Sequence, residues 1–177
     1  MAEQAKNWED VKSYTLDQED ELALFDAQIE CTLIWSSKDD WPMGVIVNYI
    51  HHDGRFWLTA SEERPRVNQI RKNPKVCIAI SSKGSSIIER QSLTYKCEAV
   101  VHTDRETLDR ILPAFANKMR PGEPEKAQAF LEMLDSPGRV VFELIPRTRV
   151  GFNSAKMWAA SEKARPSDSP SGPQSHS

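Results

Sequence analysis

The sequence of 177 residues predicts a mainly β, α+β domain, in which six or seven antiparallel strands curl into a barrel with short flanking helices. Two observations predict this class. Short runs rich in β-branched residues recur along the chain, and most are separated by tight-turn signals such as Asp53-Gly54. The helical patterns between them are short, and the length suits one domain with one core.

The composition argues against several classes of protein. The net charge of −3 disfavours a nucleic-acid surface, because proteins that bind the phosphate backbone carry a basic excess. No apolar run approaches the roughly 20 residues that cross a bilayer, and the acidic N-terminus lacks the layout of a secretory signal. The expected location is therefore the cytoplasm, with neither a membrane nor a nucleic acid as partner.

The cysteines and histidines predict no metal site. Cys31, Cys77 and Cys97 are odd in number and widely spaced, which indicates buried thiols in a reducing compartment. His51 and His52 are adjacent on a predicted hairpin, so their side chains point to opposite faces of the sheet and cannot easily share a metal.

The first half of the chain begins with a flexible, polar N-terminus over 1–14. A helix is predicted over Asp17–Glu30, because Thr15 and Gln18 have capping-box spacing and apolar residues then recur at one-face intervals. Alternating and β-branched patterns then predict strands over Cys31–Ser36, Met43–Ile50 and Phe56–Ala60, the last two joined by the Asp-Gly turn.

A second helix is predicted over Pro65–Lys72. Pro65 suits the first turn, where its missing N–H has no cost, and Val67 and Ile70 share one face. Asn73-Pro74 ends the helix, because a residue before proline avoids helical geometry. A strand over Val76–Ser81 follows at once.

The second half predicts strands over Ile87–Glu89, Leu93–His102, Val140–Ile145 and Val150–Phe152. Thr103 and Glu106 have capping-box spacing and open a helix through Phe115 that Pro113 bends. A further helix is predicted over Glu125–Leu134. The barrel domain thus spans 15–158, and the Ser/Pro-rich tail over 159–177 is predicted to be disordered.

The sharpest chemical signal is the succession of strand, short loop and helix around Pro65. A helix N-terminus presents unpaired N–H groups and partial positive charge, so it attracts anions. Arg64 and Arg66 flank this helix start, and Thr59 and Ser61 supply hydroxyls, so the donors suit a phosphate. The alternative is a solvated helix whose arginines pair with the two glutamates of the loop, Glu62 and Glu63.

The stretch DGRFWLTASEERPRVNQIRKNPKVCIAI resembles the core motif of the pyridoxamine 5′-phosphate oxidase-like superfamily, the FMN-binding split barrels. The pattern is a hairpin with Gly, a strand ending in Thr, a basic pair, a helix ending in Asn-Pro and a strand. ERQSLTYKCEAVVHTDRETLDRIL resembles the later strands and helix of the family, and the likeness extends over Leu22 to Phe152. The resemblance implies a split barrel and a homodimer with the cofactor at the interface.

The resemblance also implies which residues bind the cofactor. Arg66 matches the lysine that contacts the FMN phosphate, at the same distance before Pro74. Pro65 stands where the family often has arginine, so Arg64 would supply the second cation. The strand end that approaches the phosphate and ribityl chain is matched by Thr59, Ala60 and Ser61.

The flavin ring would lie along another strand. Val45, Ile46 and Val47 match the family's strand whose backbone contacts the ring, and Gln91, or Ser92 one residue later, lies near the place of a flavin-contacting glutamine. Backbone N–H groups at that strand could stabilise negative charge on a reduced flavin.

The implied function is an FMN-binding oxidoreductase that transfers a hydride between flavin and an unidentified small molecule. Vitamin B6 oxidase activity is disfavoured, because Met43 and Asn48 replace the family's arginine and lysine and the C-terminal motif is missing. No side chain stands out as an obligatory acid or base, so no catalytic residue is assigned. One alternative is a deazaflavin (coenzyme F420)-dependent reductase; its more anionic tail needs extra cations, for which Lys72, Lys83 and Arg90 are candidates. The other is a non-catalytic barrel that binds flavin or haem.

Overall fold

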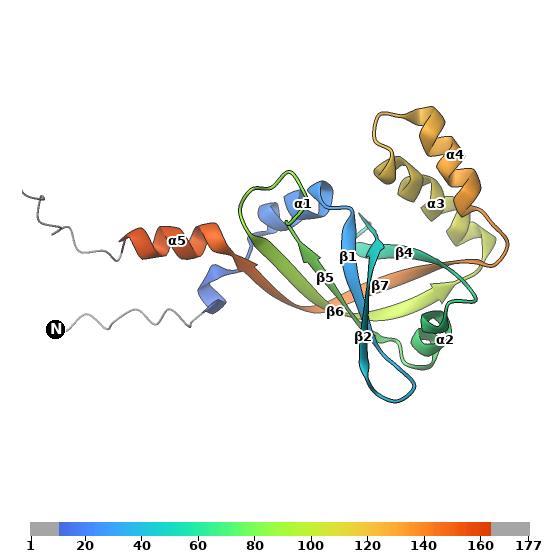
Figure 1. Cartoon of the computed structure of the whole chain (residues 1–177), viewed down its shortest axis with the longest axis horizontal. Helices are drawn as coiled ribbons and strands as arrows, with labels where there is room; N and C mark the ends of the chain where they lie inside the picture. Colours follow the sequence, from blue (N-terminus) through green and yellow to red (C-terminus); the bar gives the residue numbers. More distant parts are fainter. Residues whose placement is uncertain (1–10, 164–177) are drawn as a thin grey trace, which may run out of the picture.

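A curled antiparallel sheet forms the centre of the molecule, with the strand order β2-β1-β5-β6-β7-β4-β3 (Figure 1). The computed structural model describes residues 11–163. Within them the strands are β1 (Glu30–Ser36), β2 (Pro42–Asn48), β3 (Ile50–His52), β4 (Arg55–Ser61), β5 (Lys75–Ser81), β6 (Gln91–His102) and β7 (Arg139–Asn153). The helices are η1 (Val11–Tyr14), α1 (Gln18–Ala27), α2 (Pro65–Lys72), α3 (Arg105–Met119), α4 (Pro124–Leu134) and α5 (Ser154–Lys163). The predicted fold class is confirmed.

The two edge strands of the sheet belong to one stretch of chain. Only Tyr49 separates β2 from β3, yet β2 pairs with β1 and β3 pairs with β4. The sheet therefore closes on itself at this joint, while β2 and β4 diverge from one another beyond it. We call the unpaired space between β2 and β4 the strand opening.

The main core fills the inside of the curled sheet. Alternate residues of β4, namely Phe56, Leu58 and Ala60, point into it, as the period of two in a strand requires. Val67 and Ile70 of α2 are fully buried in the same core, so this helix closes one end of the barrel. Burying each such large side chain contributes about 1.5–3 kcal/mol, which fixes the start of α2 relative to β4.

A second core lies between the outer face of the sheet and α3 with α4, which Figure 1 shows at one end of the molecule. Trp57 and Val141 from the sheet pack against Leu112 and Phe115 of α3. Elsewhere the residues of the outer face are half-buried or exposed. One transverse row of paired residues crosses five strands, and we call it the outer row: Ile46, Thr32, Ala79, Thr94 and Val150.

Two predicted helix caps are wrong. Asp17, and not Thr15, is the N-cap of α1, and the Thr15 hydroxyl accepts a hydrogen bond from Arg149 at 3.0 Å instead. The cap of α3 is Asp104 rather than Thr103, and its carboxylate accepts from the Thr107 N–H at 2.8 Å. In both cases the spacing marked the right helix start to within two residues.

Several element boundaries also differ from the prediction. The predicted strand 87–89 is a loop, and α3 continues past Pro113 to Met119. The two predicted strands over 140–152 are one strand, β7, which has a bulge at Arg147: Lys96 pairs with Thr148 and Cys97 with Pro146. Helix α5 covers the start of the predicted tail and η1 the end of the predicted flexible N-terminus; residues 1–10 and 164–177 lie outside the described chain.

Candidate functional site

The β2 side of the strand opening presents unpaired backbone groups. The Tyr49 N–H donates to Ile29 O at 3.1 Å, and hydrogen-bonded pairs alternate along an antiparallel ladder. Val45 and Val47 therefore direct their N–H and C=O groups toward β1, whereas Ile46 directs its own into the opening. The Ile46 side chain stands on the outer face and is 68% exposed.

The β4 side of the opening is built in the same way. The Glu62 N–H donates to Gly138 O at 2.7 Å, so by alternation Ala60 faces β7 and Thr59 and Ser61 face the opening. Pairing with β3 ends at Trp57, which leaves the Thr59 backbone without a strand partner. Two strand edges thus offer hydrogen-bond donors and acceptors to anything that lies between them.

The side chains at the end of β4 are already engaged within the fold. The Thr59 hydroxyl donates to Val140 O at 3.2 Å, and Ser61 O accepts from the Arg64 N–H at 3.1 Å. Ala60 is buried in the main core. The free groups of this strand end are therefore backbone amides of Thr59 and Ser61, together with the half-buried Ser61 hydroxyl.

Helix α2 begins beside this strand end with two cations, Arg64 and Arg66, which we call the cation pair. Arg64 is the exposed N-cap residue, and Arg66 is half-buried on the first turn. The Arg66 Nε atom is buried and has no hydrogen-bond partner. Burial, and to a smaller extent the charge of Arg64, lowers the pKa of the Arg66 guanidinium. The region therefore holds positive charge that the described residues leave uncompensated.

The sequence left open that Arg64 and Arg66 pair with Glu62 and Glu63, but the structure shows a different partner for Glu62. Glu62 forms a two-pronged ion pair with Arg71, on the other side of α2, in which Arg71 Nη2 donates to Glu62 Oε2 at 2.9 Å. Within the described chain, no salt bridge joins Arg64 or Arg66 to Glu62 or Glu63. The cation pair is thus available to an external anion.

Gln91 is not close to the cation pair within one chain. It lies at the start of β6, whereas α2 meets β6 at the other end, where the Ala99 N–H donates to Pro74 O at 2.8 Å. Eight residues of strand separate the two places, which is roughly 26 Å. Gln91 is buried, with its Oε1 unpaired, and the neighbouring Ser92 is half-buried.

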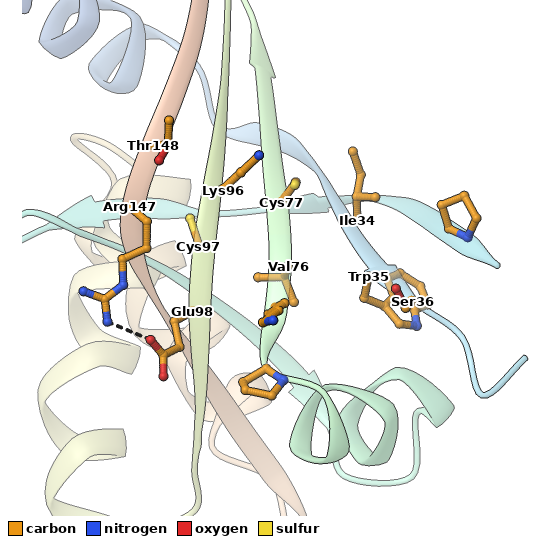
Figure 2. A pocket seen from close by; sticks show the side chains of 13 residues that line it. Ile34, Trp35, Ser36, Val76, Cys77, Lys96, Cys97, Glu98, Arg147 and Thr148 are labelled. Carbon is orange, nitrogen blue, oxygen red and sulfur yellow. Dashed lines mark hydrogen bonds and ion pairs between the residues drawn. The ribbon is translucent and has the colours of Figure 1, made fainter. Parts of the chain in front are cut away.

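A groove of about 520 Å³ lies apart from these residues and was not predicted from the sequence (Figure 2). Trp35 and Val76 give it an apolar floor, and Lys96 lies in its lining. At one side Arg147 donates to Glu98 at 2.7 Å, the pair that Figure 2 marks with a dashed line. The bulge at Arg147 of β7 lies on this side of the groove.

The remaining titratable groups of the described residues form no metal site, and two of the three cysteines are buried thiols. The residues described contain no cluster of three or more His, Cys, Asp or Glu side chains that could hold a metal. Burial raises the pKa of Cys97 to about 12 and that of Cys31 further, so neither is a thiolate near neutrality. His51 packs against Phe25 with 4.6 Å between ring centroids, and burial lowers its pKa. None of the described helices is both long and apolar enough to cross a membrane.

Comparison with known proteins gives a family and a fold. The family model for pyridoxamine 5′-phosphate oxidase matches residues 19–149, and a comparison with curated proteins found no match. Among solved structures, a conserved hypothetical protein of Mycobacterium tuberculosis superposes with a TM-score of 0.71 at 17% identity, over 90% of this chain and 95% of that one.

Three other similar structures carry a ligand in their names. They are a FAD-binding protein of Mesorhizobium loti (TM-score 0.55, 17% identity, 78% of this chain and 96% of that one), a haem storage protein of Vibrio cholerae (0.57, 15%, 78% and 95%) and an F420 reductase (0.53, 14%, 72% and 94%). At these identities the likeness shows the fold alone.

Proposed function

Because the chain belongs to the pyridoxamine 5′-phosphate oxidase family, we propose that it binds a flavin-type cofactor in the strand opening and acts as an oxidoreductase. FMN is the reference cofactor, and the reaction is hydride transfer to or from a small molecule. The observation that carries the proposal is the buried Arg66 Nε without a partner, beside a second arginine at a helix start. A phosphate supplies the missing acceptor and the missing negative charge together.

The residues present fit FMN at three places. The cation pair and the amides of Thr59 and Ser61 would hold the phosphate and the ribityl chain. The edge of β2 at Ile46 would hydrogen-bond the polar side of the ring, with Val45 and Val47 keeping that edge in place from the core side. When bound, the flavin supplies the hydride chemistry at its ring, and the protein orients the ring and excludes water.

We propose a homodimer, and an exposed uncharged face of the sheet supports it. The outer row crosses five strands without a charged residue, and its two ends, Ile46 and Val150, are 68% and 72% exposed. A second copy laid on this face would bury it and bring its own Gln91 or Ser92 toward the ring. This arrangement would bring together Gln91 and the cation pair, which are far apart within one chain because α2 meets β6 at the end opposite Gln91. We place the protein in the cytoplasm, where its three free cysteines stay reduced.

The absorbance spectrum of the purified protein tests the proposal. Flavin bands in the protein as isolated, or after incubation with FMN, support it, and bleaching by NADPH under anaerobic conditions shows that the bound cofactor accepts a hydride. A protein that binds neither FMN nor a deazaflavin contradicts it. Light scattering during size-exclusion chromatography measures the mass of the assembly, for which we expect twice the chain mass of 20.1 kDa.

Two alternatives share the fold and give different spectra. The F420 reductase among the similar structures points to a deazaflavin, whose bands lie at shorter wavelength than those of FMN. The haem storage protein points to a non-catalytic binder with an intense haem band. A non-catalytic role is also consistent with Pro65, which stands where the family often has arginine, because a weaker phosphate site disfavours tight retention of FMN.

A further inference from the structure

The groove of about 520 Å³ that Figure 2 shows lies on the outer face of the sheet, and we call it the sheet groove. One row of paired residues crosses four strands in its lining: Ile34, Cys77, Lys96 and Thr148. Each of them stands two residues along its strand from a member of the outer row, so their side chains share its face. The sheet groove therefore adjoins the outer row and continues it toward α2.

The apolar part of the sheet groove is fixed by the fold. Val76 is buried in the main core, and Trp35 packs against that core. Trp35 Nε1 donates to Gln69 Oε1 at 2.5 Å, which ties β1 to α2. Pro74, between α2 and β5, is also in the lining, and its carbonyl accepts from the Ala99 N–H at 2.8 Å. The volume falls within the range of small-molecule sites, roughly 300–1,000 Å³.

The lining of the sheet groove carries uncompensated positive charge. Lys75 and Lys96 are exposed, and neither forms a salt bridge with any residue from 11 to 163. Glu98 is the one carboxylate in the lining, and it is already engaged, because Arg147 donates to it at 2.7 Å. The lining thus has an excess of two positive charges. Lys96 belongs to the paired row itself, so one free cation lies directly beside the apolar side chains.

Apolar side chains beside free ammonium groups suit a molecule that is apolar at one end and anionic at the other. We propose that the sheet groove binds an apolar carboxylate, with its hydrocarbon part on Ile34 and Trp35 and its carboxylate at Lys75 and Lys96. Burial of the hydrocarbon part supplies most of the affinity, and the lysines select for the negative charge. None of the residues assigned to the cofactor lines this groove, so the ligand is a second molecule and the inference does not depend on the proposed function.

A second copy of the chain is the competing occupant, because the sheet groove adjoins the outer row. The composition of the two surfaces separates them. The outer row has no charged residue, whereas the groove beside it holds two free lysines. The centres of protein interfaces are depleted of charged residues, and lysine is depleted among them. An uncharged partner surface would leave Lys75 and Lys96 uncompensated, whereas a carboxylate neutralises them. The groove therefore favours a small anion over the partner subunit.

Fluorescence titration of the full-length protein with anilinonaphthalenesulfonate, an apolar anion, and with its neutral counterpart N-phenylnaphthylamine tests the proposal. Decanoate should displace the sulfonate at a lower concentration than decanamide does. Removing both lysines (Lys75→Ala with Lys96→Ala) should weaken binding of the sulfonate and of decanoate about tenfold and leave the neutral probe unchanged, because each exposed charge contact is worth about threefold in affinity.

Two further variants test the apolar part and the assignment to this groove. Ile34→Thr keeps a β-branched side chain but removes apolar surface, so it should weaken the sulfonate and the neutral probe alike, about fivefold. Lys126→Ala, on α4, removes the same charge outside the groove and should change nothing. The preference for the anion should shrink as salt is raised, since screening weakens exposed charge contacts.

The outcomes separate a ligand site from a subunit interface and from the cofactor site. Equal affinity of the double lysine variant and the wild type for the sulfonate, or equal displacement by decanoate and decanamide, overturns the proposal. A sulfonate that binds a variant with a charge in the outer row (Ala79→Glu) but not the wild type shows that a second copy covers the groove, which also overturns it. A double lysine variant that loses affinity for FMN as well contradicts a separate site. A wild-type protein that binds decanoate but no flavin supports the groove and contradicts the proposed function alone.

Discussion

Replacement of Arg66 by alanine gives the most direct test of the cofactor site. The change removes a half-buried guanidinium whose Nε has no partner in the unliganded chain. A charge-assisted hydrogen bond is worth about 1.5–3 kcal/mol. Every 1.4 kcal/mol is tenfold in affinity, so the dissociation constant for FMN should rise about 10- to 100-fold. Arg66→Lys keeps the charge and loses the forked geometry, so it should lie between alanine and the wild type.

The stability of the unliganded protein should respond very differently. The unpaired, partly desolvated Nε of Arg66 lowers the free energy of unfolding, and Arg66→Ala removes this cost. The gain offsets the packing that is lost with the aliphatic part of the arginine side chain. We therefore expect nearly the same melting temperature without cofactor, and a smaller rise in melting temperature when FMN is added. A site defect and a folding defect are thus distinguished in one experiment.

Arg71→Ala is the matched control on the same helix. It removes an exposed arginine that pairs with Glu62, on the side of α2 away from Arg66. Flavin fluorescence quenching and differential scanning fluorimetry should show unchanged FMN affinity for this variant. An Arg66→Ala protein that binds FMN as the wild type does, or an Arg71→Ala protein that loses as much affinity, refutes the placement of the phosphate.

Three further predictions concern the assembly, a helix cap and pH. Ala79→Glu puts a charge in the middle of the outer row and should convert the dimer to a monomer that retains its circular dichroism; an unchanged mass by light scattering contradicts the proposed interface. Asp104→Ala removes the cap of α3 and should lower the melting temperature, whereas Thr103→Ala should leave it unchanged. Burial lowers the pKa of His51, so the unfolded chain binds the proton more readily and stability should fall as pH drops below about 6.5. Urea denaturation at pH 7.5 and 5.5 should show a smaller drop for His51→Gln; an equal drop assigns the effect to another group.

Local signals in the sequence predicted the turns and helix ends correctly where the backbone preference of a single residue determines them. Asp53 and Gly54 adopt φ of 51° and 69°, as the tight hairpin turn requires. Pro65 and Asn73 bound α2 as predicted, because proline suits the first turn and the residue before Pro74 leaves helical geometry. These same signals located the cation pair.

Tertiary contacts decided what the sequence could not predict. Thr15 had capping-box spacing, but its hydroxyl bonds Arg149, which is 134 residues away. The sequence predicted two strands over 140–152 where the structure has one, β7, because a bulge at Arg147 lets the strand continue past Pro146, which lacks a ladder N–H. The strand opening depends on how β2 separates from β4 in the folded sheet, and no local pattern in the sequence indicates that separation.

The single residue that joins β2 to β3, Tyr49, limits how the length of this stretch can change in evolution. Side chains along a strand alternate between the two faces of the sheet. Inserting or deleting one residue between β2 and β3 would therefore move the core-facing side chains of one of these strands to the outer face. The stretch 42–61 should therefore keep its length among relatives that share this site, even where identities are low. Length variation should collect instead in the loop over 82–90 and in the connection between α3 and α4, where an added residue shifts no strand register.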